Sequence, residues 1–364
     1  MRDEEQTQPW TLSVLLALRL LALGTAAALF LLSFGSRARA EEAVPVLAQG
    51  NAQRQLIPMG RAVGIKLFSD GVMVVGLAEV PSSDGASTPA KDCGLRQGDI
   101  ITHINDTQVD TIEQVRDVLQ DLEGDKMSIR AMRGEKQVQF TAQAVACSDG
   151  SYRLGAWIRD SMAGIGTLTF ADPETGLFGT LGHGINDVDT AVLMKLQSGA
   201  ITPASVAGVV KGMNGRPGEL RGAFSSSQTL GTLYANTQSG VFGYLQDPEA
   251  VTGTPVPVAQ EAEVHTGQAT ILSNVSGTQV EEYTVEILKV YDDSRDTRDL
   301  MLRVTDPRLL EQTGGIVQGM SGSPILQDGK LVGAVTHVLV DHADRGYGIL
   351  AQNMLDQAQQ AQTT

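Results

Sequence analysis

One serine and one histidine lie in glycine-rich segments of the kind that acyl transfer requires. Ser321 lies in GMSGSP (319–324), and His183 lies in LGHGI (181–185). Glycines leave the hydroxyl and the neighbouring backbone N–H groups accessible, so these groups can stabilise negative charge on a substrate oxygen. A serine hydroxyl attacks an amide only with a base, and histidine is the usual one. The pattern predicts Ser321 as a nucleophile and His183 as its general base.

The same segments leave alternatives open. Ser323 is a second serine in the turn, Ser321 is alternatively only a turn former, and His183 is alternatively a structural histidine. The backbone N–H groups of Gly319 and Ser321 are the predicted oxyanion donors. His337 lies within an apolar strand pattern, where we expect a core residue or one that supports the site.

The base needs a group that fixes which ring nitrogen carries the proton, and the aspartates between the two segments are candidates. They are Asp187, Asp189, Asp292, Asp293, Asp296, Asp299 and Asp306. The first two follow the histidine in a polar loop, and residues 292–299 form a charged run typical of a solvated hairpin. Asp306 ends a strand-like run, where it either projects from the edge of a core or caps the turn at 307–312. Spacing alone does not select among them.

The elements that must position these residues are short strands. From residue 150 to about 347 the chain consists of apolar or alternating runs separated by glycines, and helical periodicity returns only at 350–360. About 190 residues of this pattern predict an all-β sandwich or barrel.

Residues 61–145 predict a smaller domain of strands with one helix. Apolar residues at helical spacing cover 112–122, and Asp110 with Glu113 predicts the capping box at its start. The segment CGLRQGDIITHIN (93–105) resembles the signature of PDZ domains. The sequence therefore predicts a PDZ-like α+β domain before the all-β part.

PDZ domains bind an extended peptide as an added strand. The resemblance implies such binding beside the strand-like run 63–67, at Gly64, Ile65, Lys66 and Leu67. The alternative is that this run only closes the sheet. We expect Cys93 to pack in this domain, and a disulfide with Cys147 is the alternative in an oxidising compartment.

The first 40 residues indicate targeting. Residues 11–34 form a 24-residue apolar run in which Arg19 is the only charge, long enough to cross a hydrocarbon layer of about 30 Å. The run is either a retained anchor or a cleaved signal, since Ala-Arg-Ala at 38–40 fits a signal peptidase site. The expected parts of the chain are a cytoplasmic tail with the membrane or signal segment (1–40), a linker (41–60), the PDZ-like domain (61–145) and the peptidase domain (150–360).

Composition excludes several classes of function. The formal net charge of −15 repels phosphate backbones, so a general nucleic-acid-binding role is excluded. Two cysteines and five scattered histidines show no metal-ligand spacing, and we predict neither a metal nor another cofactor.

Three segments together are similar to one peptidase family. They are LGHGI (181–185), VTDPRLLEQTGGIVQGMSGSPI (304–325) and GAVTHVLV (333–340), behind a PDZ-like domain. They resemble the sporulation stage IV protein B peptidase family. The resemblance implies a serine endopeptidase with a chymotrypsin-like double β-barrel, in which His183 is the base, Asp306 the orienting acid and Ser321 the nucleophile. It also implies action between the two membranes of a developing endospore, in the signal that activates a late sigma factor.

The sequence thus predicts a membrane-anchored or released serine endopeptidase that processes itself within residues 35–60 and cleaves a membrane-associated regulatory protein. The alternative is a non-catalytic adaptor whose PDZ domain clamps a membrane partner. A general quality-control protease of the high-temperature-requirement type is disfavoured, because in those enzymes the PDZ domain follows the protease domain.

Overall fold

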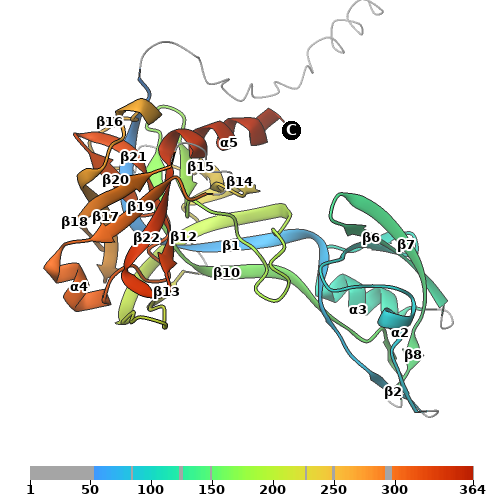
Figure 1. Ribbon diagram of the computed structural model, residues 1–364. Coiled ribbons are helices and arrows are strands. Elements are labelled where there is room, and N and C mark those ends of the chain that lie inside the picture. The colour runs from blue at the N-terminus through green and yellow to red at the C-terminus, as the bar shows by residue number, and fades with distance from the viewer. Residues whose placement is uncertain are drawn as a thin grey trace, which may run out of the picture. The chain divides into compact units, whose positions relative to one another are not determined.

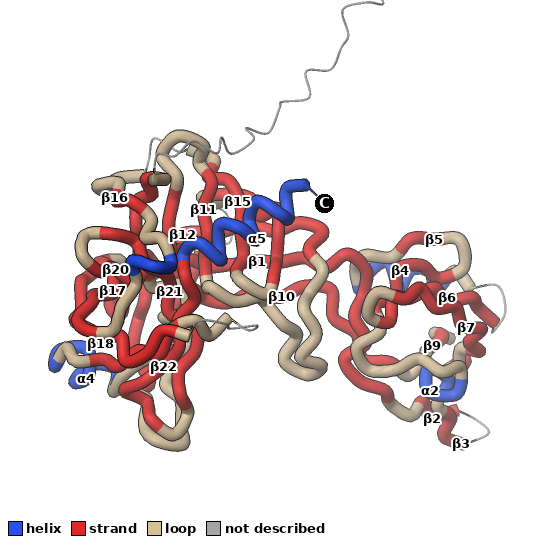
Figure 2. The backbone as a smooth tube through the Cα atoms, turned by 45° about the horizontal axis from the view of Figure 1, so that its top comes forward, coloured by secondary structure: helices blue, strands red, loops and turns tan. Residues whose placement is uncertain are grey.

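The computed structural model describes residues 53–82, 85–122, 126–147, 150–225, 228–247, 251–291 and 297–363. The predicted membrane or signal segment and most of the predicted linker lie outside these residues. Among the residues that are described, no helix is long and apolar enough to span a membrane. The expectation of a mainly β fold is confirmed (Figure 2).

Two closed rings of antiparallel strands form the part of the chain that the sequence predicts as the peptidase domain. In the first ring each strand pairs with the next, and a pairing between β12 and β1 closes it. Its strands, in ring order, are β1 (Gln55–Leu77), β10 (Ala156–Ala171), β11 (Leu177–Thr180), β15 (Gly240–Leu245), β14 (Gly231–Thr237) and β12 (Leu196–Val210). The second ring is the closed barrel β17 (Gly267–Ser276), β18 (Gln279–Val290), β19 (Leu300–Val304), β22 (His342–Leu350), β21 (Lys330–Leu339) and β20 (Pro324–Gln327).

Apolar residues that alternate along the strands fill each barrel. In the second barrel, Val285 and Ile287 of β18 and Leu300 and Leu302 of β19 are buried in one cluster. Alternation places every second side chain on the inner face, which explains why the polar residues between them stay outside. The predicted pattern of short alternating runs therefore corresponds to barrel strands.

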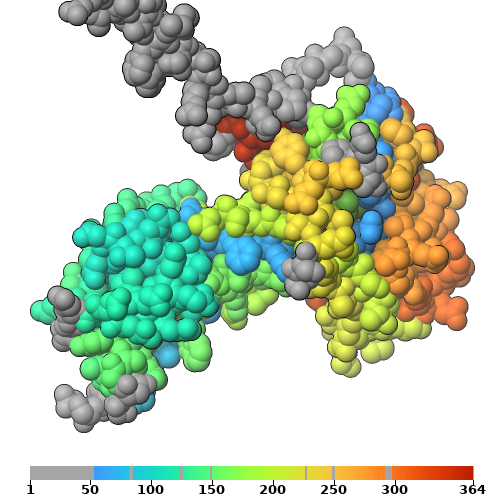
Figure 3. All heavy atoms as spheres, turned by 180° about the vertical axis from the view of Figure 1, so that it is seen from behind, coloured from blue at the N-terminus to red at the C-terminus, as the bar shows by residue number. Residues whose placement is uncertain are grey.

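The PDZ domain is an insertion between the first two strands of the first barrel (Figure 1). Both strands are long enough to belong to two sheets. β1 pairs with β10 from Ile57 to Phe68 in the barrel and again from Met73 to Leu77, where it also pairs with β4 (Ile100–Ile104). Figure 3 shows part of β1 as a blue band beside the yellow-green residues of β12. The two domains are thus joined by a continuous pair of strands.

This arrangement corrects the predicted boundaries. Residues 55–60 are not linker, because they begin β1, and Leu56 and Ile57 are buried. Residues 61–68 are not part of the PDZ domain, because they pair with β10 on one side and β12 on the other. At the other end, the PDZ sheet extends past residue 145 into the first residues of β10.

The PDZ sheet and its helices occupy most of the insertion. Its remaining elements are β2 (Val80–Ser82), β3 (Gly85–Ser87), α2 (Pro89–Asp92), β5 (Thr107–Gln108), α3 (Ile112–Gln120), β6 (Lys126–Arg133), β7 (Lys136–Gln143), β8 (Val145–Ala146) and β9 (Tyr152–Arg153). The predicted helix is confirmed as α3, but its capping box is shifted by one residue. Thr111 accepts from the backbone of Gln114, and the Gln114 side chain accepts from Thr111, so Asp110 and Glu113 are not the pair.

A few elements flank the barrels. They are β13 (Glu219–Phe224), β16 (Val256–Pro257), the 3₁₀ turn η2 (Glu261–Glu263), α4 (Pro307–Thr313) and α5 (Ala351–Thr363). Of the two strands, β13 pairs with β12 and β16 pairs with β1. The helical periodicity expected near the C-terminus is confirmed in α5, which buries Met354 and Leu355 against both barrels' strands.

Candidate active site

The turn that carries Ser321 depends on glycine. Gly319 and Gly322 have φ of +95° and +97°, in the left-handed region that side chains rarely adopt. A Cβ on Gly322 would lie 2.1 Å from the carbonyl oxygen of Thr167 on β10. Thr167 also donates its N–H to the carbonyl of Ser321 at 3.1 Å and its hydroxyl to that of Gly319 at 2.8 Å. The first barrel therefore holds the serine turn of the second.

The two serines of this turn differ in accessibility. Ser321 lies at a pocket, and its Oγ donates to the carbonyl oxygen of Thr336 at 2.7 Å. Ser323 is 0% exposed, and its Oγ donates to Ser273 Oγ at 3.0 Å. A nucleophile must reach its substrate, so the geometry favours Ser321 over the alternative Ser323.

His183 follows β11, and its ring has a defined tautomer. Nδ1 lies 2.9 Å from the carbonyl oxygen of Gly184. A carbonyl can only accept, so Nδ1 carries the proton and Nε2 keeps its lone pair. The ring of His337 lies beside it, with centroids 5.1 Å apart and planes tilted by 36°. His183 is therefore arranged as a proton acceptor at Nε2, and the ring of His337 packs against it.

Burial changes the basicity of His183. Loss of solvent lowers the pKa of the imidazole from its ordinary value, and the hydrogen bond to Gly184 opposes this only in part. The ring is consequently neutral, and able to accept a proton, at a lower pH than a histidine in water.

His183 and Ser321 line one pocket with a volume of about 290 Å³. Much of its lining is apolar. It includes Ile65 of β1, Met162 of β10 and Ile185, which lies shortly after the histidine. Gly319 also lines it. Among the hydrogen bonds of the described residues, the backbone N–H groups of Gly319 and Ser321 have no protein acceptor. The pocket is thus lined by a serine, a histidine and two residues whose backbone N–H groups have no protein acceptor.

The structure shows no hydrogen bond between Asp306, the predicted orienting acid, and His183. Asp306 is the N-cap of α4, where it accepts from the backbone N–H of Arg308 at 2.9 Å and of Thr284 at 3.2 Å. Its carboxylate also pairs with the Arg308 guanidinium at 3.0 Å. The hydrogen bonds from Arg308 hold the pKa of Asp306 below its usual value. The alternative, that Asp306 caps the turn that follows it, is confirmed.

The other aspartates are also engaged elsewhere. Asp187 and Asp189 pair with Arg159, and Asp299 accepts from Leu350 N–H and Asn353, both at 2.7 Å. Asp292, Asp293 and Asp296 lie outside the described residues. Within the described part of the chain, no carboxylate forms a hydrogen bond with His183.

The predicted peptide-binding strand is also corrected. Gly64 to Leu67 pair with β10 on one side and with β12 on the other, so this strand has no edge for a ligand. Within the described residues, a free edge beside α3 belongs instead to the first residues of β10, 156–160. Ile112 at the start of α3 donates its N–H to Asp160 there at 2.9 Å, and Trp157 is 67% exposed. An open strand edge next to a helix is the geometry that PDZ ligands use.

A signal for this edge was present in the sequence. Gly155 precedes the strand with φ of +74°, and the apolar residues Ala156, Trp157 and Ile158 follow it. The same strand continues into the barrel, so the sequence pattern placed all of it in the predicted peptidase domain.

Cys93 and Cys147 are both free thiols, so the alternative disulfide is absent. The described residues contain no group of three or more residues that could hold a metal ion.

Two protein-family models match this chain. The family model described as SpoIVB peptidase S55 matches residues 150–355, more than half of the chain. The chain belongs to the SpoIVB peptidase S55 family. A PDZ model matches residues 85–133. The S55 match contains both His183 and Ser321, and the protein is a serine endopeptidase with a PDZ domain that acts on protein or peptide substrates.

Several solved structures are similar to this S55 peptidase. The PDZ domain of an SdrC-like protein from Listeria monocytogenes is 25% identical over 24% of this chain and 87% of its own, with a TM-score of 0.20. The active form of the Rv3671c protease from M. tuberculosis is 16% identical over 67% and 83%, with a TM-score of 0.31. The HtrA-type protease AlgW with a tripeptide is 14% identical over 54% and 55%, with a TM-score of 0.34. The search of curated proteins gives no match.

Proposed function

We propose that Ser321 is the nucleophile of this endopeptidase and His183 its general base. The backbone N–H groups of Gly319 and Ser321 are the oxyanion donors in this proposal. The observation that carries it is the single pocket lined by His183, Gly319 and Ser321, into which no competing hydroxyl opens from Ser323.

In this reaction His183 first accepts a proton and then returns it. The Ser321 hydroxyl leaves the carbonyl of Thr336, its oxygen bonds to the scissile carbonyl carbon, and its proton passes to Nε2 of His183. The oxyanion is held by the two N–H groups. When the C–N bond breaks, His183 returns the proton to the leaving amine. A water then attacks the acyl ester with His183 again as base, which releases the acid and restores the serine.

The backbone carbonyl of Gly184 takes the orienting role in this scheme. It holds the proton on Nδ1 and so keeps Nε2 free to accept. It has no formal charge with which to stabilise the imidazolium that forms during the reaction, so the expected stabilisation is smaller than that given by a carboxylate.

We further propose that the enzyme processes its own N-terminal region and cleaves a membrane-associated regulatory protein in endospore development. Membership of the S55 family and the apolar run at residues 11–34 support this. On the same grounds we propose that the enzyme acts on the extracytoplasmic side, between the forespore and mother-cell membranes. The apolar lining of the pocket favours an apolar substrate side chain beside the scissile bond.

A fluorophosphonate probe tests the catalytic assignment, because it reacts with an activated serine. Wild-type protein and the Ser323→Ala variant should be labelled, whereas Ser321→Ala and His183→Ala should not. Ser323→Ala is the matched control, since it removes a hydroxyl two residues away that is buried. Labelling that persists in Ser321→Ala would exclude Ser321, and no labelling of the wild type would favour the adaptor alternative.

A further inference from the structure

Residues 185–194, shortly after His183, form a loop. The tip of this loop folds around the buried carboxylate of Asp187. Asp187 is 1% exposed. Its Oδ1 accepts the backbone N–H groups of Asp189 and Thr190 at 3.0 and 2.9 Å, and the Thr190 hydroxyl at 3.0 Å. The conformation of this loop therefore depends on a charge that lies out of water, four residues after the histidine.

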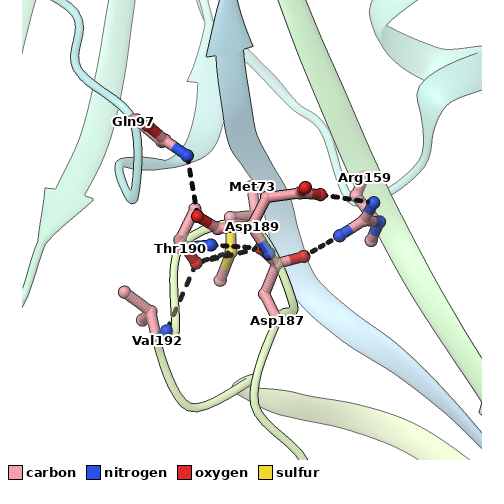
Figure 4. A network of polar contacts seen from close by, with 7 residues as sticks. All are labelled: Met73, Gln97, Arg159, Asp187, Asp189, Thr190 and Val192. Atoms are coloured by element: carbon pink, nitrogen blue, oxygen red, sulfur yellow. Dashed lines mark hydrogen bonds and ion pairs between the residues drawn. The ribbon is translucent and has the colours of Figure 1, made fainter. Parts of the chain in front are cut away.

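Arg159 of β10 pairs with both carboxylates of the loop (Figure 4). Its Nη1 donates to Asp187 Oδ2, and its Nη2 donates to Asp189 Oδ2 at 2.8 Å. Burial alone would raise the pKa of Asp187, but the hydrogen bonds from Arg159 and Thr190 outweigh it, and the pKa lies below its usual value. A buried carboxylate stays charged only where a cation compensates it. The loop thus needs Arg159 to keep its shape.

The base of the loop is fixed from the first barrel. Asn236 of β14 accepts from Ile185 N–H at 2.9 Å and donates to the carbonyls of Ile185 and Met194 at 3.0 and 2.8 Å. Ile185 lies two residues from His183. Anchors at its base and at its tip therefore hold the loop that directly follows His183 and Gly184, and so restrict where the imidazole lies.

The anchor at the tip comes from the PDZ end of the long strands. Arg159 is paired with Met73 in the PDZ part of β1, and it belongs to the segment 156–160 that forms the free edge. Gln97 of the PDZ domain donates to the Asp189 carbonyl at 2.9 Å, and the Thr190 hydroxyl contacts the Met73 sulfur at 3.4 Å (Figure 4). The histidine loop is thus attached to both domains.

We propose that Arg159 is a positioning residue for the peptidase reaction, which acts on His183 from the PDZ end of β10 through Asp187. The inference rests on the proposed function, because it takes His183 as the base. Arg159 does not line the pocket, so its substitution should change how the base is placed and leave probe binding unaffected.

The test measures fluorophosphonate labelling of the full chain as a function of probe concentration. Arg159→Gln should lower the maximal labelling rate at least about tenfold, since small displacements of a base are costly, and should leave the half-saturating probe concentration unchanged. Arg159→Lys should recover part of the rate, because an ammonium can pair with Asp187 but cannot hold both carboxylates in a fork.

A matched control exists in the same barrel. Arg54 pairs with Asp172 Oδ2 at 2.6 Å, and Asp172 Oδ1 accepts two backbone N–H groups of its own turn, from Glu174 at 2.9 Å and Thr175 at 3.2 Å. Arg54→Gln therefore removes the same kind of ion pair from a turn that does not line the pocket. It should lower the melting temperature and leave the labelling rate of the folded protein unchanged.

Two results would overturn the inference. One is a rate for folded Arg159→Gln equal to that of the wild type, and the other is an equal slowing by Arg54→Gln. If Arg159→Gln does not fold, Asp187→Asn replaces it, since the amide keeps an oxygen that can accept the loop N–H groups but loses the charge that pairs with Arg159. That variant should be slower than the wild type, and an unchanged rate contradicts the proposal. Absence of Ser321-dependent labelling in the wild type would instead overturn the proposed function.

Discussion

Nδ1 of His183 lies 2.9 Å from the carbonyl oxygen of Gly184, the next residue along the chain. The group that fixes the tautomer of His183 is therefore backbone, supplied by Gly184, which joins the histidine to the loop at 185–194. Such an orienting group cannot be protonated or removed by a side-chain substitution. The catalytic geometry depends instead on the conformation of that loop.

The rate of Ser321 labelling should depend on pH with a midpoint below 6.5, the ordinary pKa of histidine. Burial is the largest influence on His183 and lowers its pKa, while the bond to Gly184 raises it in part. Because the neutral imidazole is the active form, the rate is retained at mildly acidic pH and is lost as the pH falls through this lowered pKa. Maximal labelling rates measured across the pH range check this, and a midpoint at or above the ordinary value would contradict it.

Asp306→Ala should reduce stability by about 1 kcal/mol or somewhat more, because it removes a helix cap and an ion pair. Asp306→Ser keeps a capping oxygen and should restore part of that loss. Below the unfolding temperature, both variants should label at Ser321, since Asp306 forms no bond with His183. Thermal melts and labelling of the same samples check the prediction. A folded Asp306→Ser variant that does not label would show that the carboxylate itself acts in catalysis.

Gly322→Ala should abolish labelling and destabilise the fold. The added methyl group would meet the backbone oxygen of Thr167 at 2.1 Å and the N of Leu181 at 2.6 Å, at a φ that alanine rarely adopts. Gly164→Ala is the control, because it also lines the pocket but has open space at the Cβ position. It should fold and label. Equal behaviour of the two variants would contradict this account of the serine turn.

Self-processing should leave residues from Gln55 onward intact. Leu56 and Ile57 are buried in β1, so a cut within the strand would disrupt the first barrel. Mass mapping of the wild type should find new N-termini before residue 55, and Ser321→Ala should yield none. A stable, active product that begins within 56–68 would be inconsistent with this fold.

The sequence was sufficient for the local features of the site. The glycines around Ser321 and His183 indicated accessible groups because positive φ and close backbone approach require that residue. The alternating runs predicted β structure, and the PDZ signature lies in a segment where turn, strand and helix follow one another directly.

The long-range features were beyond sequence spacing. Asp306 follows a strand whether it orients a histidine or caps a helix, so its position in the sequence fits both roles. Only the fold shows that its oxygens face Arg308 and Thr284. β1 and β10 each continue through two sheets as one strand. The short polar stretches at the junction, Ser69 to Gly71 and Arg159 to Ser161, do not show from the sequence that the strand goes on into a second sheet. Pairing partners on both sides of Gly64 to Leu67 come from residues about a hundred or more positions away.

The insertion of the PDZ domain into the barrel limits how this enzyme can be shortened. A chain that starts at residue 150, where the family match begins, lacks β1 and cannot close its first barrel. A minimal peptidase would instead have to be made by internal excision. Phe68 and Ser161 are directly paired, so a tight turn between them would retain both barrel strands. The excised segment includes Arg159, so we expect the shortened enzyme to fold but to react slowly.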